Sequence, residues 1–163
     1  MNRDYAQIRQ TLDRAISNDM ARDQRMAACV DALWPVLSPT GVSWLGFYSR
    51  EPGADEMILQ ARRDKPACSP IGMHGACGQS CTTKTTLIIT DVANLGEGYV
   101  ACDPRDLSEL VIPLIDADGE CWGVYDADSF DRDAFDENDA CETLALLVAA
   151  GLATDPVVLI RVI

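Results

Sequence analysis

A cysteine followed closely by acidic residues is the first candidate for chemistry in this sequence. Cys102 lies in a turn-prone loop that ends at Glu109, just before a strand-like apolar run. A thiol attacks as the thiolate, which usually needs a nearby cation or a helix N-terminus. The acids that follow it here, Asp103, Asp106 and Glu109, are expected to raise its pKa instead. This setting argues against a papain-like hydrolase, as does the presence of a single histidine, His74, which is expected to face solvent.

The same setting suits the reduction of a sulfoxide, in which a thiol attacks sulfur and an acid protonates the departing oxygen. Two more carboxylates, Asp126 and Asp128, follow Glu109 along the chain. If the three crowd together, at least one is expected to stay protonated, and the others can hold an ammonium group. The thiol becomes a sulfenic acid, with which Cys68 or Cys77 can condense to form a disulfide.

The size and composition of the chain fit one globular domain. Its 163 residues can bury a single core, and 48% of them are hydrophobic. The formal net charge of −13 argues against nucleic acid or an anionic membrane as a partner. The first residues lack the apolar core of a signal peptide, and no apolar run is long enough to cross a membrane. We therefore expect a cytoplasmic protein.

Seven cysteines are many for a cytoplasmic domain, where they are expected to be reduced. Cys29 and Cys141 fall in apolar helical patterns and are predicted to be core residues, and Cys81 and Cys121 are interpreted as structural too. A zinc site would have to use the central cysteines, Cys68, Cys77, Cys81 and Cys102. The long gap after the first of these is not a zinc-finger spacing, so no metal site is predicted.

Hydrophobic spacing predicts two helices within residues 2–37, a sheet with its loops over about 40–130, and a helix over about 136–151. Strands are expected at residues 42–48, 57–61, 87–92, 110–115 and 121–126. A turn at Asp118-Gly119 joins the last two strands into a hairpin. This order predicts a single α+β domain with the helices on one face of the sheet. The apolar tail, 156–163, fits no predicted element.

Alternation along the first strand places Trp44, Gly46 and Tyr48 on the face opposite Leu45 and Phe47. The glycine between two aromatic residues leaves a slot, which indicates either ordinary core packing or an apolar box for a small group.

The same alternation predicts that Trp122, Val124 and Asp126 share one face of the last strand. Asp128 joins them if the strand continues that far.

These residues together resemble those of the free methionine-(R)-sulfoxide reductases, enzymes built on a single GAF domain. The resemblance covers residues 40–150, and its motifs are Trp44-Leu45-Gly46-Phe47-Tyr48, Cys68, Gly75-Ala76-Cys77-Gly78, Asp91-Val92, Ala101-Cys102-Asp103, Ser108-Glu109 and Asp126-Ala127-Asp128-Ser129. Three cysteines and three carboxylates thus fall at spacings near those of the family.

The resemblance implies reduction of free L-methionine-(R)-sulfoxide to methionine, with no bound cofactor. Thioredoxin, or dithiothreitol in its place, would be the external reductant. By the same resemblance Cys102 is the nucleophile, Cys68 the resolving cysteine and Cys77 an auxiliary thiol of the pocket.

The family also implies roles for the acids and aromatic residues. Glu109, Asp126 and Asp128 would bind the substrate's ammonium group and sulfoxide oxygen. Trp44 and Tyr48 would enclose its methyl group. A six-stranded antiparallel sheet and a homodimer are further expectations from the resemblance.

The sequence departs from the family beside the nucleophile. Tyr99-Val100 stands where the family commonly has His-Ile, the loop at 96–98 is one residue longer, and residues 103–107 replace a small, polar run. The alternative prediction is a non-catalytic GAF domain that binds a small molecule and signals through a partner.

Overall fold

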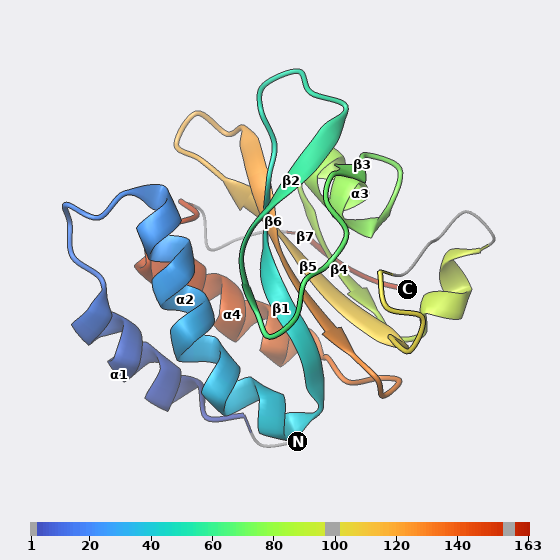
Figure 1. The fold of residues 1–163 in the computed structure, drawn as a ribbon, viewed down its shortest axis with the longest axis horizontal. Coiled ribbons are helices and arrows are strands. Elements are labelled where there is room, and N and C mark those ends of the chain that lie inside the picture. The colour runs from blue at the N-terminus through green and yellow to red at the C-terminus, as the bar shows by residue number, and fades with distance from the viewer. Residues whose placement is uncertain (1–2, 97–101, 155–158) are drawn as a thin grey trace.

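A curled sheet forms the centre of the computed structural model, which describes residues 3–96, 102–154 and 159–163 (Figure 1). Within these ranges the sheet has seven strands in the order β3-β2-β1-β6-β5-β4-β7. Their bounds are Val42–Ser49 (β1), Glu56–Arg63 (β2), Ile71–Gly72 (β3), Thr85–Ile89 (β4), Ser108–Ile115 (β5), Cys121–Ser129 (β6) and Leu159–Val162 (β7). The α+β prediction is confirmed, with one strand more than expected.

The sheet is mixed rather than wholly antiparallel, because β7 pairs with β4 in parallel. This strand lies in the apolar tail that the sequence pattern left without an element. The backbone N–H of Ile163 donates to the carbonyl of Ile88 at 2.9 Å, which extends the pairing by one residue. An edge strand packs on one side only, so its pattern of side chains is a weak signal.

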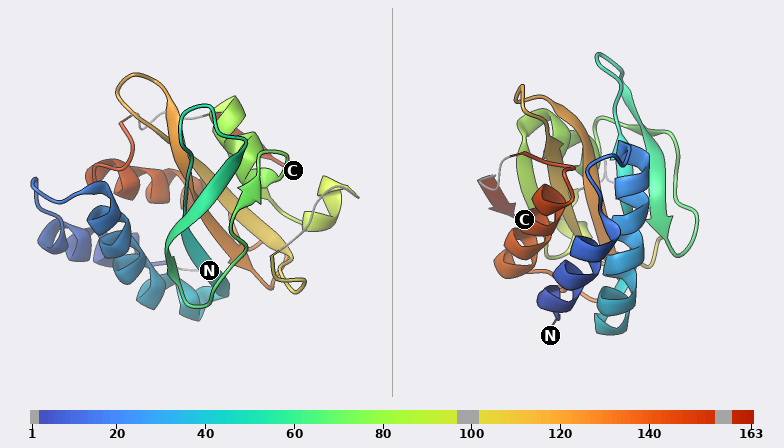
Figure 2. Two further views of the ribbon diagram at one scale, coloured as in Figure 1. Left: turned by 45° about the horizontal axis from the view of Figure 1, so that its top comes forward. Right: turned by 90° about the vertical axis from the view of Figure 1, so that its left-hand side faces the viewer.

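Three helices cover one face of the sheet, and a fourth lies on the opposite face (Figure 2). The covering helices are α1 (Tyr5–Ala15), α2 (Arg22–Leu37) and α4 (Glu137–Ala149). The helix on the other face is α3 (Ala76–Thr83), which packs against β4, β5 and β6. No helix within the described ranges is long and apolar enough to span a membrane.

The predicted alternation along β1 is confirmed, since its side chains divide between two cores. Leu45 and Phe47 pack beneath the three helices, whereas Trp44 and Tyr48 join the core on the side of α3. Each face of this strand is therefore apolar, as expected for a strand buried between two layers.

Trp122 does not share a face with Val124, contrary to the prediction. Its ring packs in the core beneath the helices, its Nε1 donates to the carbonyl of Leu152 at 3.1 Å, and Arg22 of α2 stacks on it at 4.0 Å. The register between β5 and β6 shifts at this point, which re-aims the side chain. Strand β6 does continue past Asp128, so Asp126 and Asp128 share a face as expected.

The core prediction holds for Cys29, which is fully buried, and is wrong for Cys141, which is exposed. The buried stripe of α4 follows Ala140, Leu144 and Leu147. Cys141 lies one position after that stripe begins, which turns its side chain toward solvent.

Candidate active site

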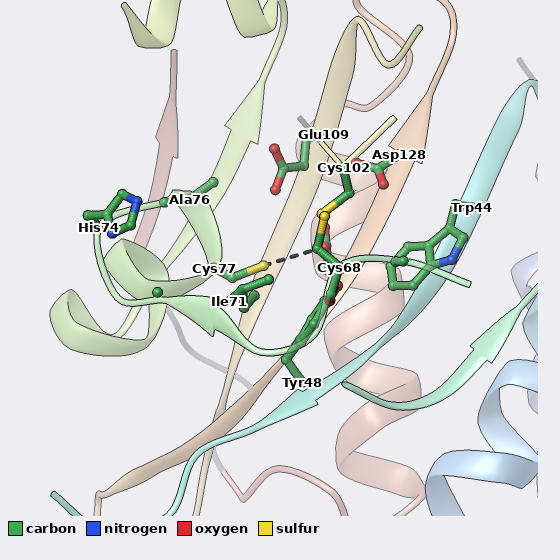
Figure 3. A pocket seen from close by; sticks show the side chains of 14 residues that line it. Trp44, Tyr48, Cys68, Ile71, His74, Ala76, Cys77, Cys102, Glu109 and Asp128 are labelled. Carbon is green, nitrogen blue, oxygen red and sulfur yellow. Dashed lines mark hydrogen bonds between the residues drawn. The ribbon is translucent and has the colours of Figure 1, made fainter. Parts of the chain in front are cut away.

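A cavity of about 210 Å³ lies on the α3 side of the sheet, between the sheet and the segments that precede α3 (Figure 3). The structure brings all eight residues singled out from the sequence to its wall: Trp44, Tyr48, Cys68, Cys77, Cys102, Glu109, Asp126 and Asp128. They come from β1, β5, β6, α3 and two loops, so the pocket depends on the whole fold.

The register of the sheet places the three acids next to one another. Glu109 of β5 is directly opposite Asp128 of β6, and Asp126 lies two residues away on the same face. Asp128 and Asp126 in turn face Trp44 and Gly46 of β1. Cross-strand partners have side chains in contact range, so the acids crowd one wall of the pocket.

Asp126 is buried, at 7% exposed. Its Oδ2 accepts a hydrogen bond from the Cys77 thiol at 3.4 Å, whereas its buried Oδ1 has no partner among the described residues. Burial raises the pKa of Asp126 to about 7, and the charge of Asp106 adds to that effect, while hydrogen bonds with Cys77 and Glu109 oppose it. A carboxyl of this kind holds its proton close to neutral pH.

Asp128 and Cys77 share this environment. Burial, and then the charges of Asp126 and Glu109, raise the pKa of Asp128 well above its ordinary value. Burial and the same two acids raise the pKa of the Cys77 thiol. The directions agree with the expectation that crowding keeps at least one acid protonated.

The side chains of Cys102 and Cys68 lie side by side (Figure 3), and a hydrogen bond between the thiols contributes to the pKa of Cys102. All seven cysteines fall in the described ranges, and all are free thiols. Loss of water around the thiol, the hydrogen bond with Cys68 and the charge of Asp126 raise the pKa of Cys102 to about 12. The pKa of Cys102 is raised, as predicted. The acid among these causes is Asp126, however, and not one of the acids that follow Cys102 in the sequence.

Asp103, the acid next to Cys102, binds two cations rather than acting on the thiol. Asp103 forms ion pairs with Lys65 and Arg105, which hold the pKa of its carboxyl well below the ordinary range. Both cations also pack over the ring of Phe130, at 5.0 and 4.5 Å from its centroid. The run that departs from the family thus fastens the Cys102 loop to the end of β6. The other departures, at Tyr99-Val100 and in most of the loop at 96–98, lie outside the described residues, as does Ala101 of the nucleophile motif.

Trp44 and Tyr48 form the apolar wall, with ring centroids 6.2 Å apart. The Trp44 Nε1 donates to the carbonyl of Lys65 at 3.0 Å, and the Tyr48 hydroxyl donates to the carbonyl of Cys68 at 2.9 Å. Both aromatic residues therefore also position the loop that carries Cys68. The slot at Gly46 is not open to a ligand, because the Trp44 ring fills it: a Cβ there would lie 2.6 Å from Trp44 Cη2.

Gly46→Ala is expected to destabilise the protein by about 1–3 kcal/mol, because the new methyl group displaces the Trp44 ring or the strand. Urea unfolding monitored by circular dichroism measures the change. Gly75→Ala is the matched control, since a Cβ there meets nothing within 4 Å and its φ is −75°. An equal loss of unfolding free energy in both variants would show that the packing of the Trp44 ring does not require a glycine at position 46.

The comparison with known proteins rests on most of the chain. Residues 22–153 match the GAF domain family. The chain belongs to the GAF domain family. The free methionine-R-sulfoxide reductase of Saccharomyces cerevisiae is 39% identical over 111 residues, which are 66% of this chain and 61% of that protein. The matched part thus spans about three fifths of that relative.

Two solved structures resemble this GAF domain along almost their whole length. One is the free methionine-R-sulfoxide reductase of Neisseria meningitidis in complex with its substrate, with a TM-score of 0.77 and 28% identity over 93% of this chain and 89% of that one. The other is fRMsr of Staphylococcus aureus in complex with substrate, with a TM-score of 0.79 and 28% identity over 90% and 93%.

The sequence pattern predicts no helix around Cys77, whereas the GAF domain carries this residue in the first turn of α3. Sequence reasoning also missed the lining residues Ala67, Ile71 and Gly72, and it named Gly75 and Ala76 only as part of a family motif. Nothing in their types marks them as lining a pocket. His74 is exposed as expected, and lies at the rim of the pocket with its ring against Gly72.

The four-cysteine zinc site considered from the sequence is not assembled in this GAF domain. Cys81 is not part of the pocket wall, and its thiol lies 3.6 Å from the carbonyl of Cys121. A different trio, Cys77, Glu109 and Asp126, has ligand atoms within 4.8 Å of one another. Cys77 and Asp126 could bind a cation only after losing the protons that burial makes them keep.

Proposed function

We propose that this GAF domain reduces free L-methionine-(R)-sulfoxide to methionine. The observation that carries the proposal is the meeting of a hydrogen-bonded pair of thiols, Cys102 and Cys68, with three crowded acids in one cavity. The relatives that are named free methionine-R-sulfoxide reductases support it. A domain that only binds a small molecule would need neither the paired thiols nor a carboxyl that keeps its proton near neutral pH.

The cavity suits an amino acid with a short, polar sulfur group. Its volume, about 210 Å³, is that of a small molecule rather than a peptide segment. An ionised carboxyl among Glu109, Asp126 and Asp128 would hold the substrate's ammonium group. Trp44 and Tyr48 would face its methyl group. Because the ammonium group would be enclosed by the acids, a preceding peptide residue would have no room, and we propose the free amino acid as substrate.

In the first half of the reaction, Cys102 would attack the sulfoxide sulfur. The protonated carboxyl of Asp126 would supply a proton to the sulfoxide oxygen, which weakens the S–O bond. The oxygen would end on Cys102 as a sulfenic acid, and methionine would leave as the thioether. The substrate is reduced by two electrons, and Cys102 is oxidised by the same two.

In the second half, the Cys68 thiol would condense with the sulfenic acid. A disulfide between Cys68 and Cys102 would form and one water molecule would leave. The hydrogen bond between the two thiols supports this pairing over one with Cys77, whose thiol donates to Asp126. Thioredoxin, or dithiothreitol in its place, would return both cysteines to thiols by disulfide exchange.

The remaining expectations belong to the same proposal. Residues 1–163 would act as one GAF domain in the cytoplasm, without a bound cofactor or metal. A homodimer is expected from the family resemblance alone, and sedimentation analysis would test it.

The test is an epimer-resolved turnover assay with racemic free methionine sulfoxide and dithiothreitol. We expect the R epimer to be consumed completely and the S epimer to remain. Consumption of neither epimer, together with saturable binding of methionine sulfoxide by calorimetry, would instead favour the sensor alternative. A blocked N-acetyl methionine sulfoxide serves as the control, because it lacks the ammonium group that the acids would bind.

A further inference from the structure

A second pair of cysteines lies between α3 and β6, outside the pocket. Cys81 is in the last turn of α3, and Cys121 begins β6. The Cys81 thiol lies 3.6 Å from the backbone carbonyl of Cys121, and the Cys121 thiol donates to the carbonyl of Gly123 at 3.1 Å. Helix α3 packs against β6 along this line, so the fold itself holds the two sulfurs together.

Two cations, Arg50 and Lys84, act on this pair, whereas the acids Asp23, Glu51, Asp116 and Glu120 line the cavity beside it. The charges of Arg50 and Lys84 both favour the thiolate form of Cys81. Lys84 itself lies 3.8 Å from the carboxylate of Glu120. The hydrogen bond from Cys121 and the two cations lower the pKa of Cys81 to about 7, against the effect of burial. The hydrogen bond with Cys81 raises the pKa of Cys121. The two thiols therefore titrate together, and the first proton to be lost belongs to the pair rather than to one cysteine.

The pair has a route to solvent. Cys121 and Arg50 line a second cavity, of about 710 Å³, whereas Cys81 behind them is only 2% exposed. A small oxidant can approach through this cavity, but a protein disulfide cannot reach the inner sulfur. The thiolate near a cation, with a second thiol in contact, has the properties of an oxidation-sensitive site.

We propose that Cys81 and Cys121 form a second redox-active pair, which hydrogen peroxide converts to a disulfide. The thiolate of the pair attacks one peroxide oxygen, breaks the O–O bond and becomes a sulfenic acid, and one water leaves after proton transfer. The other thiol then displaces the oxygen as a second water, and the S–S bond forms. Overall, two thiols lose two electrons and hydrogen peroxide becomes two water molecules. A small dithiol reverses the step by exchange.

The experiment uses the full chain with Cys68→Ser and Cys102→Ser, so that the thiols of the substrate pocket do not compete. The protein is treated with hydrogen peroxide at pH 7, remaining thiols are alkylated, and peptides are analysed by mass spectrometry. We expect a cross-link between the peptides that contain Cys81 and Cys121, lost again with dithiothreitol. Exposed Cys141 is the internal control, and its oxidation should be at least about tenfold slower than that of the pair.

Two further variants in the same background assign the partner, because Cys77 and Cys81 share a tryptic peptide. The cross-link should persist in Cys77→Ser and disappear in Cys81→Ser, with circular dichroism confirming that both are folded. Oxidation of Cys121 no faster than of Cys141, or a cross-link that survives Cys81→Ser, would overturn the inference. The readout does not involve methionine sulfoxide, so it is independent of the proposed function.

Discussion

Cys102→Ser is expected to lower turnover of methionine-(R)-sulfoxide by about a thousandfold or more, because a serine hydroxyl cannot accept the oxygen as a sulfenic acid does. Cys68→Ser should behave differently. With Cys102 intact, the oxygen transfer still occurs, but the sulfenic acid has lost its hydrogen-bonded partner. This variant should form about one methionine per chain and then stop when thioredoxin is the reductant.

Rapid-quench measurement of methionine formed per chain separates these outcomes. Cys141→Ser is the matched control, since this cysteine is also exposed but lies on α4, on the face of the sheet opposite the pocket. It should turn over like the unaltered protein. Full multiple turnover of Cys68→Ser with thioredoxin would refute Cys68 as the resolving residue, and activity of Cys102→Ser would refute the nucleophile.

The unaltered protein is expected to lose stability as the pH rises from about 4 to about 7. Asp126→Asn is expected to make this loss much smaller. The native pKa of Asp126 is raised to about 7, from an ordinary value of 3.8. Between these values the native state binds a proton that the unfolded state has released, so the free energy of unfolding falls as pH rises. Three pKa units correspond to about 4 kcal/mol at full ionisation, an upper bound because the acids are coupled.

Asparagine keeps the shape of the carboxyl and cannot ionise, so the variant should gain stability relative to the unaltered protein at pH 8 and lose that advantage at pH 4. Urea unfolding at several pH values measures both slopes. Asp13→Asn removes a carboxylate from the exposed side of α1 and serves as the control. An unchanged slope in Asp126→Asn would mean that burial does not hold the proton on this residue.

The parts of the fold with strong periodic patterns could be predicted from the sequence. The alternation along β1, the hairpin at Gly119, whose φ is 79°, and the buried stripes of the helices all follow from local chemistry. Helix α3 could not be predicted, because Ala-Cys-Gly-Gln-Ser-Cys-Thr-Thr has low helix propensity and a weak apolar stripe. Its packing against three strands stabilises it instead.

The residues of the candidate site could be named from the sequence, but their contacts could not. The grouping of Glu109 with Asp128 depends on strand register, and the ion pairs of Asp103 depend on a lysine 38 positions away. The misplacement of Trp122 has the same origin, since a single shift in register reverses which face a residue takes. The contact between Cys81 and Cys121 joins elements 40 positions apart, which spacing alone does not reveal.

The three acids belong to strands, whereas the sulfurs of Cys68 and Cys102 belong to loops. In the proposed reaction, substrate recognition and electron transfer would therefore depend on different parts of the polypeptide. If the proposal holds, changes to these loops would alter how the oxidised cysteines are reduced, while the spacing of the three carboxylates on the strands would stay the same. A change of substrate with the same cysteines would instead require new side chains or a new register on the paired strands. We expect this change to be rarer among natural variants.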